Sequence, residues 1–331
     1  MPPAGSYQCG IRSPLRGGPK AWILTGGDGK AGQGTMRITL IGPGAIGCTV
    51  GAALIEAGHD VTFCARQAFS RLSVQKAGEP ARNHPAHVVV AAKDVEPAEW
   101  AVLCVKAHQV ASAAGWLRAA VGPGTKVAVL QNGVEQRENV EPFVPPGTAI
   151  VPVVVELPVS RTAPGQVVWK RIALLSTLDD AAGKAFCALF AGTFVTAEAT
   201  DDFVTRAWLK MCNNAPSGAI LALTGQPMRV MHAHGIADVA RAILKETVAV
   251  ARAEGAVIGD TQIERQIEFF LAANPGDGNS MHADRVAERE MEWNARNGVI
   301  VRKAARHGIA VPVSAALVPL LAAISNGYVA G

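Results

Sequence analysis

The 331-residue sequence has no long apolar run, no paired cysteines and no cluster of basic residues. Because no uninterrupted apolar stretch reaches the roughly 20 residues of a membrane helix, we expect no membrane span. The six cysteines form no CxxC pair and no spacing typical of a disulfide framework, so we expect reduced thiols and a cytoplasmic protein. The 31 basic residues are spread along the chain at a net charge of +4, which gives no support to nucleic-acid binding.

The composition is that of a globular protein, with 49% hydrophobic and 18% charged residues, and the length suits two domains. Residues 1–35 differ from the rest because they are rich in Gly and Pro and lack hydrophobic periodicity. We expect these residues to form a flexible N-terminal extension, with Met36 as a candidate for the natural start of the chain.

Two segments of different texture follow the extension. Up to about residue 199, apolar runs alternate with helical stretches, which predicts an α/β domain with a parallel, doubly wound sheet. Residues 200–331 show mainly helical periodicity, with helices predicted over 201–223, over 236–255 and from Met281 to about His307. The apolar faces of this half favour a homodimer formed through it. In the first segment, strands are predicted at 37–41, 60–65, 87–92, 101–105, 126–130, 149–157, 166–170 and 172–176, with one helix ending at Ala57 and another near 109–120.

A GxGxxG motif follows the first predicted strand and opens the first predicted helix. It consists of Gly42, Pro43, Gly44, Ala45, Ile46 and Gly47. In such a motif the first glycine permits a tight turn, the second lets the backbone approach a pyrophosphate, and the third allows the helix to pack closely on the strand. Because the motif stands between a strand and a helix, it predicts a bound dinucleotide.

The residue that closes the second predicted strand indicates which dinucleotide is bound. Folds that bind NAD usually place an acid there, where it accepts hydrogen bonds from the ribose 2′-OH. Here Arg66 follows the strand, and the nearest acid, Asp60, precedes it. An arginine can bind a 2′-phosphate through two hydrogen bonds, so the sequence favours NADP(H) over NAD(H).

Polar side chains follow two further predicted strands. Lys106 and Gln109 come after the fourth strand, and Asn132 with Gly133 comes after the fifth. Ligands of open α/β sheets bind at the carboxyl ends of the strands, so these side chains are expected to line the cofactor site. For Asn132 and Gly133 an ordinary turn remains an alternative.

Lys210 and Asn214 are four residues apart in the helical half and therefore share one face of a helix. An ammonium group near a ketone can protonate the oxygen while hydride reaches the carbon. The apolar surroundings would lower the pKa of such a lysine by desolvation. The alternative is a lysine that extends along the surface into solvent.

A charged segment near the C-terminus carries Ser280 and Glu292. By its charge pattern alone, most of this segment is expected to be a solvated helix face. No metal site is predicted, because no third ligand stands at metal-binding spacing from the histidine pairs His84/His87 and His232/His234.

Taken together and in order, these blocks resemble the ketopantoate reductase (2-dehydropantoate 2-reductase) family from Met36 to about Ile324. The blocks are "GPGAIG", the "AR" that closes the second strand, "VKAHQ", "QNGVE", "WLKMCNNA", "NSMHAD" and "EMEWNARNGVIVRKAARHGIAVP". The resemblance implies a Rossmann domain over 36–199, a helical domain over 200–331 and a site between them. It also implies a cytoplasmic NADP-dependent oxidoreductase that reduces a 2-oxo acid, ketopantoate first, in pantothenate biosynthesis.

The resemblance also implies roles for individual residues. Lys210 would be the general acid, and Glu292 would help to position substrate and cofactor. Ser280 would hold the substrate carboxylate and Asn214 the polar end of the substrate. Contacts with NADPH are implied for Asn132, Lys106 and Arg66, and Asn132 is also expected to contact the substrate.

One departure from the family pattern concerns the substrate side of the site. The family usually has a second Asn four residues after the first, whereas this chain has Gly218. Loss of a buried polar group changes which substrate hydroxyl can be satisfied, so another branched 2-oxo acid stays open as the substrate. Two different functions also stay open. One is a dehydrogenase of the β-hydroxyacid type, against which Ser280 and Glu292 argue. The other is a non-catalytic NADPH-binding regulator, which Gly218 favours slightly but against which the presence of Lys210, Asn214, Ser280 and Glu292 together argues.

Overall fold

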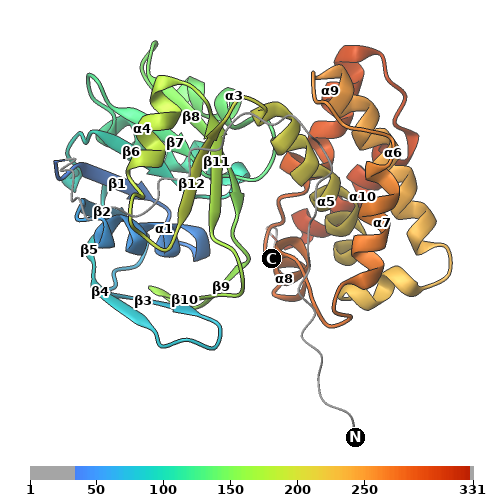
Figure 1. The fold of residues 1–331 in the computed structure, drawn as a ribbon, viewed down its shortest axis with the longest axis horizontal. Helices are drawn as coiled ribbons and strands as arrows, with labels where there is room; N and C mark the ends of the chain where they lie inside the picture. The colour runs from blue at the N-terminus through green and yellow to red at the C-terminus, as the bar shows by residue number, and fades with distance from the viewer. Residues whose placement is uncertain (1–33, 329–331) are drawn as a thin grey trace, which may run out of the picture. The chain divides into compact units, whose positions relative to one another are not determined.

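The computed structural model describes residues 34–328. The predicted extension over residues 1–35 and Cys9 within it lie outside the described residues, apart from Gly34 and Thr35. From Thr35 onward the chain forms one unit. In Figure 1 the strands come from the first part of this unit and most of the helices from the last part.

The main sheet has eight strands in the order β12-β11-β8-β7-β6-β1-β2-β5. The strands are β1 (Arg37–Ile41), β2 (Asp60–Cys64), β5 (His87–Val89), β6 (Trp100–Leu103), β7 (Lys126–Val129), β8 (Ala149–Glu156), β11 (Leu174–Leu178) and β12 (Thr196–Thr200). Neighbours from β5 to β8 are parallel, whereas β11 is antiparallel to β8 and parallel to β12. The predicted parallel sheet is therefore confirmed, and β1 is buried at four of its five residues, as expected for a central strand.

The helices of the first part differ in places from the prediction. α1 (Ala45–Glu56) ends before Gly58, whose φ of +89° suits glycine. The helix expected near 109–120 begins only at Ala114, because the chain first makes two 3-10 turns, Ala107–Gln109 and Ala111–Ala113. The other helices of this part are α2 (Ala114–Ala120), α3 (Gln136–Val140) and α4 (Ala181–Ala188).

A second, four-stranded sheet was not foreseen as a separate layer. Its order is β4-β3-β10-β9, with β3 (Arg71–Lys76), β4 (Arg82–Pro85), β9 (Val159–Ala163) and β10 (Gln166–Trp169). α1 contacts β1 and β2 of the main sheet as well as β3, β9 and β10 of the small one. The small sheet therefore covers the outer side of α1 (Figure 1).

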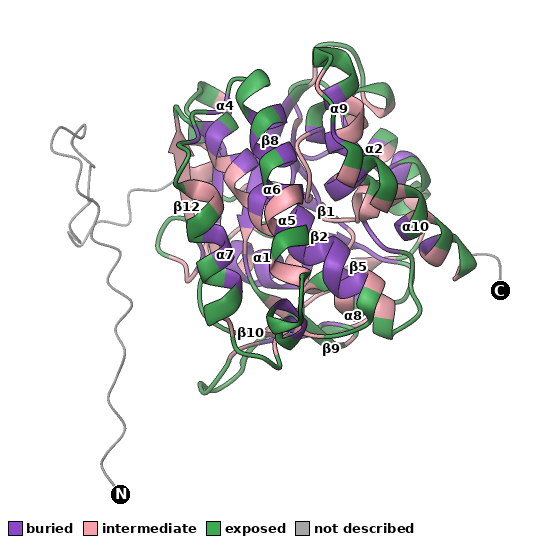
Figure 2. Ribbon diagram, turned by 90° about the vertical axis from the view of Figure 1, so that its right-hand side faces the viewer, coloured by how far each residue is buried: buried purple, intermediate pink, exposed green. Residues whose placement is uncertain are grey.

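Beyond β12, six α-helices form most of the chain that the structure describes. They are α5 (Phe203–Thr224), α6 (Ile236–Ala253), α7 (Gln262–Ala272), α8 (Ser280–Val286), α9 (Val299–His307) and α10 (Pro312–Gly327). Buried residues run through α5 and the neighbouring face of α6, which form the core of this part (Figure 2). Within residues 34–328, no helix has the length and apolar character needed to cross a membrane.

The single helix predicted from Met281 to His307 is wrong. α8 ends at Val286, Glu288 adopts a positive φ of 49°, and the chain resumes as a π-helical turn over Asn294–Gly298 that leads into α9. In between, the buried Met291 donates its backbone N–H to Ser325 Oγ on α10 at 3.0 Å. A continuous helix would keep that N–H in an internal bond, so the contact with α10 competes with helix formation here.

Candidate active site

The glycine-rich turn at the end of β1 has room for a ligand at its centre. Gly42 has a φ of +89°, and a Cβ on it would lie 2.5 Å from Val105 Cγ1. A Cβ on Gly47 would lie 2.5 Å from Gly42 O, whereas one on Gly44 would meet no atom within 4 Å. These are the tight turn, the close packing and the open approach that the motif requires, and Pro43, Ala45 and Ile46 complete the turn.

The N-terminus of α1 suits an anion. Gly44 is its N-cap and offers no side-chain cap, and the first turn has no acidic residue. The first backbone N–H groups of a helix have no partners within the helix, and the helix dipole favours negative charge there. The turn and the helix therefore fit a dinucleotide pyrophosphate.

Arg66 lies two residues beyond the end of β2 and is exposed. Its side chain makes no hydrogen bond or ion pair with any residue in the described part of the chain. The guanidinium is thus available at the carboxyl edge of the sheet, near the turn after β1, where Gly42 N–H donates to Cys64 O at 3.2 Å.

Lys106 connects the end of β6 to the helical part of the chain. Its ammonium group donates to Asp284 Oδ2 on α8 at 2.6 Å. The side chain of Gln109 turns back, and its Oε1 accepts the backbone N–H of Lys106 at 3.4 Å. In this structure the ammonium of Lys106 is therefore held by α8, and Gln109 stabilises the loop.

Glu292 and Asn132 come together although 160 residues separate them. Glu292 is only 6% exposed. Its Oε2 accepts a hydrogen bond from Asn132 Nδ2 at 3.0 Å, and its Oε1 accepts one from the Ala107 N–H at 3.4 Å. Burial by itself would raise the pKa of Glu292, but the Arg296 guanidinium, these hydrogen bonds and the Lys106 charge hold it below its ordinary value. Glu292 is consequently an ionised, buried carboxylate.

Lys210 lies on α5, and its ammonium group donates to the Val155 carbonyl oxygen of β8 at 2.6 Å. Burial lowers the pKa of Lys210 to about 8, and the nearby Arg296 cation contributes to the lowering, whereas Glu292 and Glu156 act in the opposite direction. A lysine with this pKa is still protonated at neutral pH and gives up its proton more readily than an ordinary lysine.

Asn214 follows Lys210 by one helical turn and is 8% exposed. Its Nδ2 is buried and has no hydrogen-bond partner among the described residues. Across from α5, the hydroxyl of Ser280 at the start of α8 accepts a hydrogen bond from Arg296 Nη2 at 2.6 Å. Unpaired buried donors are rare, so Asn214 Nδ2 marks a place where a ligand acceptor fits.

Arg296 is the residue that sequence reasoning missed. It is 2% exposed, and its Nη2 lies 3.6 Å from Glu292 Oε2. In the sequence it stands in a charged run that is typical of a solvated helix face. The available signal was its spacing of four residues from Glu292, which places two opposite charges on the same side of a helical turn.

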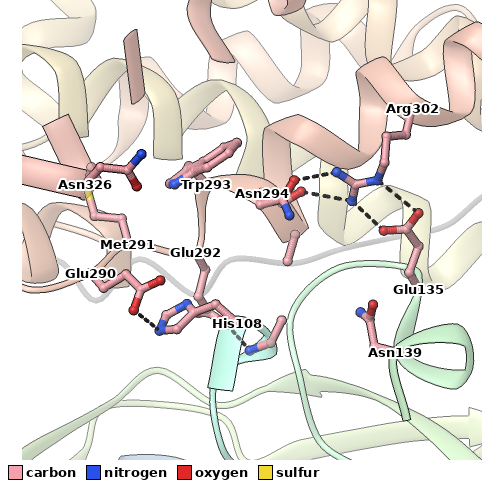
Figure 3. A pocket seen from close by; sticks show the side chains of 12 residues that line it. His108, Glu135, Asn139, Glu290, Met291, Glu292, Trp293, Asn294, Arg302 and Asn326 are labelled. Carbon is pink, nitrogen blue, oxygen red and sulfur yellow. Dashed lines mark hydrogen bonds and ion pairs between the residues drawn. The ribbon is translucent and has the colours of Figure 1, made fainter. Parts of the chain in front are cut away.

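A cavity of about 160 Å³ lies beside Glu292 (Figure 3). His108 and Glu290 face each other there, with 3.4 Å between His108 Nε2 and Glu290 Oε2. Burial lowers the pKa of His108, although the neighbouring carboxylates Glu290 and Glu292 oppose the shift. No three His, Cys, Asp or Glu side chains within residues 34–328 are grouped so that they could hold a metal ion.

Comparisons with known proteins identify the family of the chain. Residues 38–176 match the family described as "Ketopantoate reductase PanE/ApbA", and residues 202–325 match its C-terminal part. The chain is 43% identical over 287 residues to a 2-dehydropantoate 2-reductase of Caulobacter vibrioides, an alignment that covers 86% of this chain and 97% of the relative.

Solved structures share the fold. A PanE/ApbA family ketopantoate reductase from Ralstonia eutropha superposes with a TM-score of 0.80 at 27% identity, over 88% of this chain and 99% of that one. A D-mandelate dehydrogenase solved with NADH and anilino(oxo)acetate superposes with a TM-score of 0.77 at 21% identity, over 88% and 99%.

The Rossmann-type sheet, the glycine-rich turn and the attached helices define a pyridine-nucleotide oxidoreductase. The matches over both parts of the chain then show that it belongs to the ketopantoate reductase family, so the resemblance stated from the sequence is confirmed.

Proposed function

We propose that this protein reduces 2-dehydropantoate to pantoate with NADPH. The observation that carries this proposal is that Lys210, whose pKa is lowered, lies near enough to the buried, ionised Glu292 for its charge to act on the lysine, and that Glu292 is hydrogen bonded to Asn132 at the strand ends. The name of the Caulobacter relative supports the choice of substrate.

The cofactor is proposed to bind along the carboxyl edge of the sheet. The turn made by Gly42, Gly44 and Gly47 would hold the pyrophosphate, and Arg66 would bind the 2′-phosphate. When bound, NADPH supplies the hydride that reduces the carbonyl carbon. Further contacts are proposed for Pro43, Ala45, Ile46, Lys106, Gln109, Asn132 and Glu292.

The remaining chemistry is assigned to side chains of the helical part. Lys210 Nζ exchanges its hydrogen bond with Val155 O for one with the substrate oxygen, to which it transfers a proton. Glu292 orients the amide of Asn132 and keeps Lys210 protonated at neutral pH, because its charge favours the ammonium form. Ser280 is assigned to the substrate carboxylate, and the free Nδ2 of Asn214 to another substrate oxygen.

The proposal includes the organisation of the chain. We place the border between a cofactor-binding domain (36–199) and a helical domain (200–331) where β12 ends and α5 begins. We also propose a cytoplasmic homodimer formed through the helical domain, since Val239, Phe269 and Leu320 expose apolar side chains there. Light scattering after size-exclusion chromatography should give twice the mass of one chain, and the monomer mass would refute the dimer.

A substrate panel tests the activity. NADPH oxidation is followed with 2-dehydropantoate and other branched 2-oxo acids, and NADP⁺ reduction is followed with 3-hydroxy acids. We expect the highest kcat/KM for 2-dehydropantoate. Preferential oxidation of a 3-hydroxy acid would instead support a β-hydroxyacid-type dehydrogenase, and NADPH binding without turnover of any acid would support a regulator.

A second measurement tests the cofactor, because one structural neighbour was solved with NADH. Wild type should prefer NADPH, and Arg66→Gln should lower kcat/KM for NADPH about tenfold or more while leaving that for NADH unchanged. Arg118→Gln, which removes an exposed arginine from α2, serves as the control. Equal use of both cofactors by wild type would contradict the assignment of Arg66.

A further inference from the structure

Arg296 is a buried cation whose partners are incomplete. Its Nη2 donates to the neutral hydroxyl of Ser280 at 2.6 Å, and its one close carboxylate among the described residues, Glu292, lies 3.6 Å away, too far for a good hydrogen bond. Its Nε is buried and has no partner within residues 34–328. Because a buried guanidinium normally has its N–H groups satisfied by acceptors, this arrangement leaves room for a further acceptor.

The backbone around Arg296 is unusual as well. The residue stands in the π-helical turn Asn294–Gly298, which follows Glu292 closely and leads directly into α9. π-Helical turns are rare, and they occur frequently at functional sites. Here the turn accompanies a guanidinium directed toward α5.

The guanidinium lies beside Gly218, where the resemblance expects a second Asn. A Cβ on Gly218 would be 3.9 Å from Arg296 Nη1 and 3.0 Å from Met281 Sδ. The absence of a side chain at 218 thus leaves a space that Met281 borders most closely and the Arg296 guanidinium borders next. A positively charged donor from the turn therefore lies beside the position where the resemblance leads us to expect a neutral amide on the helix.

The local charge balance favours an anion. The cations Lys210 and Arg296 face one buried carboxylate, Glu292. The other nearby acids already have partners, since Glu156 pairs with Arg206 at 3.5 Å and Asp284 pairs with Lys106 at 2.6 Å. One additional negative charge would neutralise the excess, and a carboxylate matches the planar fork of a guanidinium.

We propose that Arg296, together with Ser280, binds the carboxylate of the substrate and so makes this enzyme strictly selective for acids. This inference rests on the proposed function and assigns the recognition of the acid group to a residue outside α5. With the carboxylate held at Arg296 and Ser280, the adjacent ketone is directed toward Lys210. A neutral analogue leaves the buried guanidinium unsatisfied, which is the situation that gives strong discrimination.

The test compares an acid with its neutral amide. The matched pair is 3,3-dimethyl-2-oxobutanoate and 3,3-dimethyl-2-oxobutanamide, which have the same branched carbon skeleton and no hydroxyl that could form a lactone; 2-dehydropantoate is the reference substrate. The variants are Arg296→Gln and Arg296→Lys. Arg241→Gln is the control, because Arg241 forms an ion pair with Glu264 on the helical part, at 2.8 Å, outside the proposed site.

Arg296→Gln should lower kcat/KM for the acid by about 10²-fold or more and leave that for the amide nearly unchanged, so that the acid-to-amide ratio collapses. Arg296→Lys should retain part of the ratio, because it keeps the charge without the fork. Calorimetry of pantoate with the NADP⁺-loaded protein should show the same loss of affinity in Arg296→Gln, with NADP⁺ affinity unchanged.

A second test of the role of Arg296 does not depend on a single substitution. It uses Gly218→Asn and the double variant Gly218→Asn/Arg296→Gln. Gly218→Asn should weaken pantoate binding, because the new side chain competes with the guanidinium for space. In the double variant the amide takes the place of the cation, so pantoate binding should recover relative to Arg296→Gln, and the two substitutions should be non-additive.

The possible outcomes distinguish an error in the role of Arg296 from an error in the proposed function. If wild type reduces 2-oxo acids and Arg296→Gln keeps the acid-to-amide ratio, Arg296 is only a counter-ion of Glu292 and this inference is overturned alone. If wild type binds NADPH but reduces no 2-oxo acid, the proposed function fails and the inference fails with it.

Discussion

Two walls of the candidate site are built in different ways. α5 is an uninterrupted helix of 22 residues in which Lys210, Asn214 and Gly218 follow one another at intervals of four, on one face. The facing wall, Ser280–Gly298, consists of the short helix α8, an irregular stretch over residues 287–292 and a π-helical turn. We call this second wall the interrupted segment.

The two walls are held in place by different kinds of interaction. α5 is fixed by its own backbone hydrogen bonds and by burial, since 15 of its 22 residues are buried and eight of them belong to the hydrophobic core of the helical part. The interrupted segment is fixed by contacts with other elements: Met291 with Ser325, Asp284 with Lys106, and Glu292 with Asn132. Substitutions at those contacts should therefore disturb the site more than substitutions on the outer side of the segment.

The largest of the three effects that probe this comparison is expected at Glu292. Glu292→Gln should lower kcat/KM by about 10²-fold, because it leaves the buried Arg296 without its carboxylate and weakens the contacts with the strand ends. Steady-state kinetics provide the measurement. Glu288→Gln is the matched control, since Glu288 is exposed on the same segment. An equal loss of kcat/KM in Glu288→Gln would show that removal of any charge from the segment has this effect, and would contradict a specific role for the contacts of Glu292.

A smaller effect is expected where the interrupted segment meets the strand ends. Gly133 has a φ of +99°, and a Cβ on it would lie 2.8 Å from the Ala295 carbonyl oxygen. Gly133→Ala should lower the free energy of unfolding by about 2 kcal/mol or more, because backbone strain and a clash add up.

Gly147→Ala separates these two causes. Gly147 has a φ of +81°, but a Cβ on it would meet no atom within 4 Å, so only the backbone strain applies, about 1 kcal/mol. Urea denaturation of both variants measures the difference. Equal losses would contradict the close approach of Gly133 to the interrupted segment.

The smallest effect concerns the hydrogen bond that holds the irregular stretch over residues 287–292 to α10. Ser325→Ala removes the acceptor of the buried Met291 N–H and should lower the free energy of unfolding by about 1 kcal/mol. Ser314→Ala on the same helix is the control, because the Ser314 hydroxyl is buried and has no partner among the described residues. If the two variants lose the same stability, the bond to Met291 does not hold the segment.

The sequence predicted the elements whose pattern is local. Seven of the eight strands of the main sheet, the glycine-rich turn and α5 follow from periodicity and from a motif in its strand–helix context, and the structure confirms them. The edge strand β12 was not predicted. The family was also recognised correctly from the order and spacing of short blocks. The roles of individual site residues stay predictions.

The sequence did not predict features that depend on contacts between distant segments. The helix expected from Met281 to His307 is broken because Met291 bonds to Ser325, 34 residues away. From the sequence Arg296 looked like a surface charge, because its spatial neighbour Gly218 stands 78 positions earlier in the chain. A glycine in the sequence does not show which side chain lies beside it in the fold. Local sequence patterns do not reveal contacts between distant segments, so both features became visible only in the three-dimensional structure.

The most direct test of the central claim, that Lys210 is the proton donor, is the pH dependence of kcat/KM for 2-dehydropantoate in wild type and in Lys210→Ala. Only the ammonium form can donate a proton, and the pKa of Lys210 is lowered to about 8. Wild-type kcat/KM should therefore be constant below this pH and fall about tenfold per pH unit above it. Lys210→Ala should lower the plateau by about 10²-fold or more and lose the falling limb. An unchanged plateau, or a falling limb that persists in Lys210→Ala, would contradict the claim.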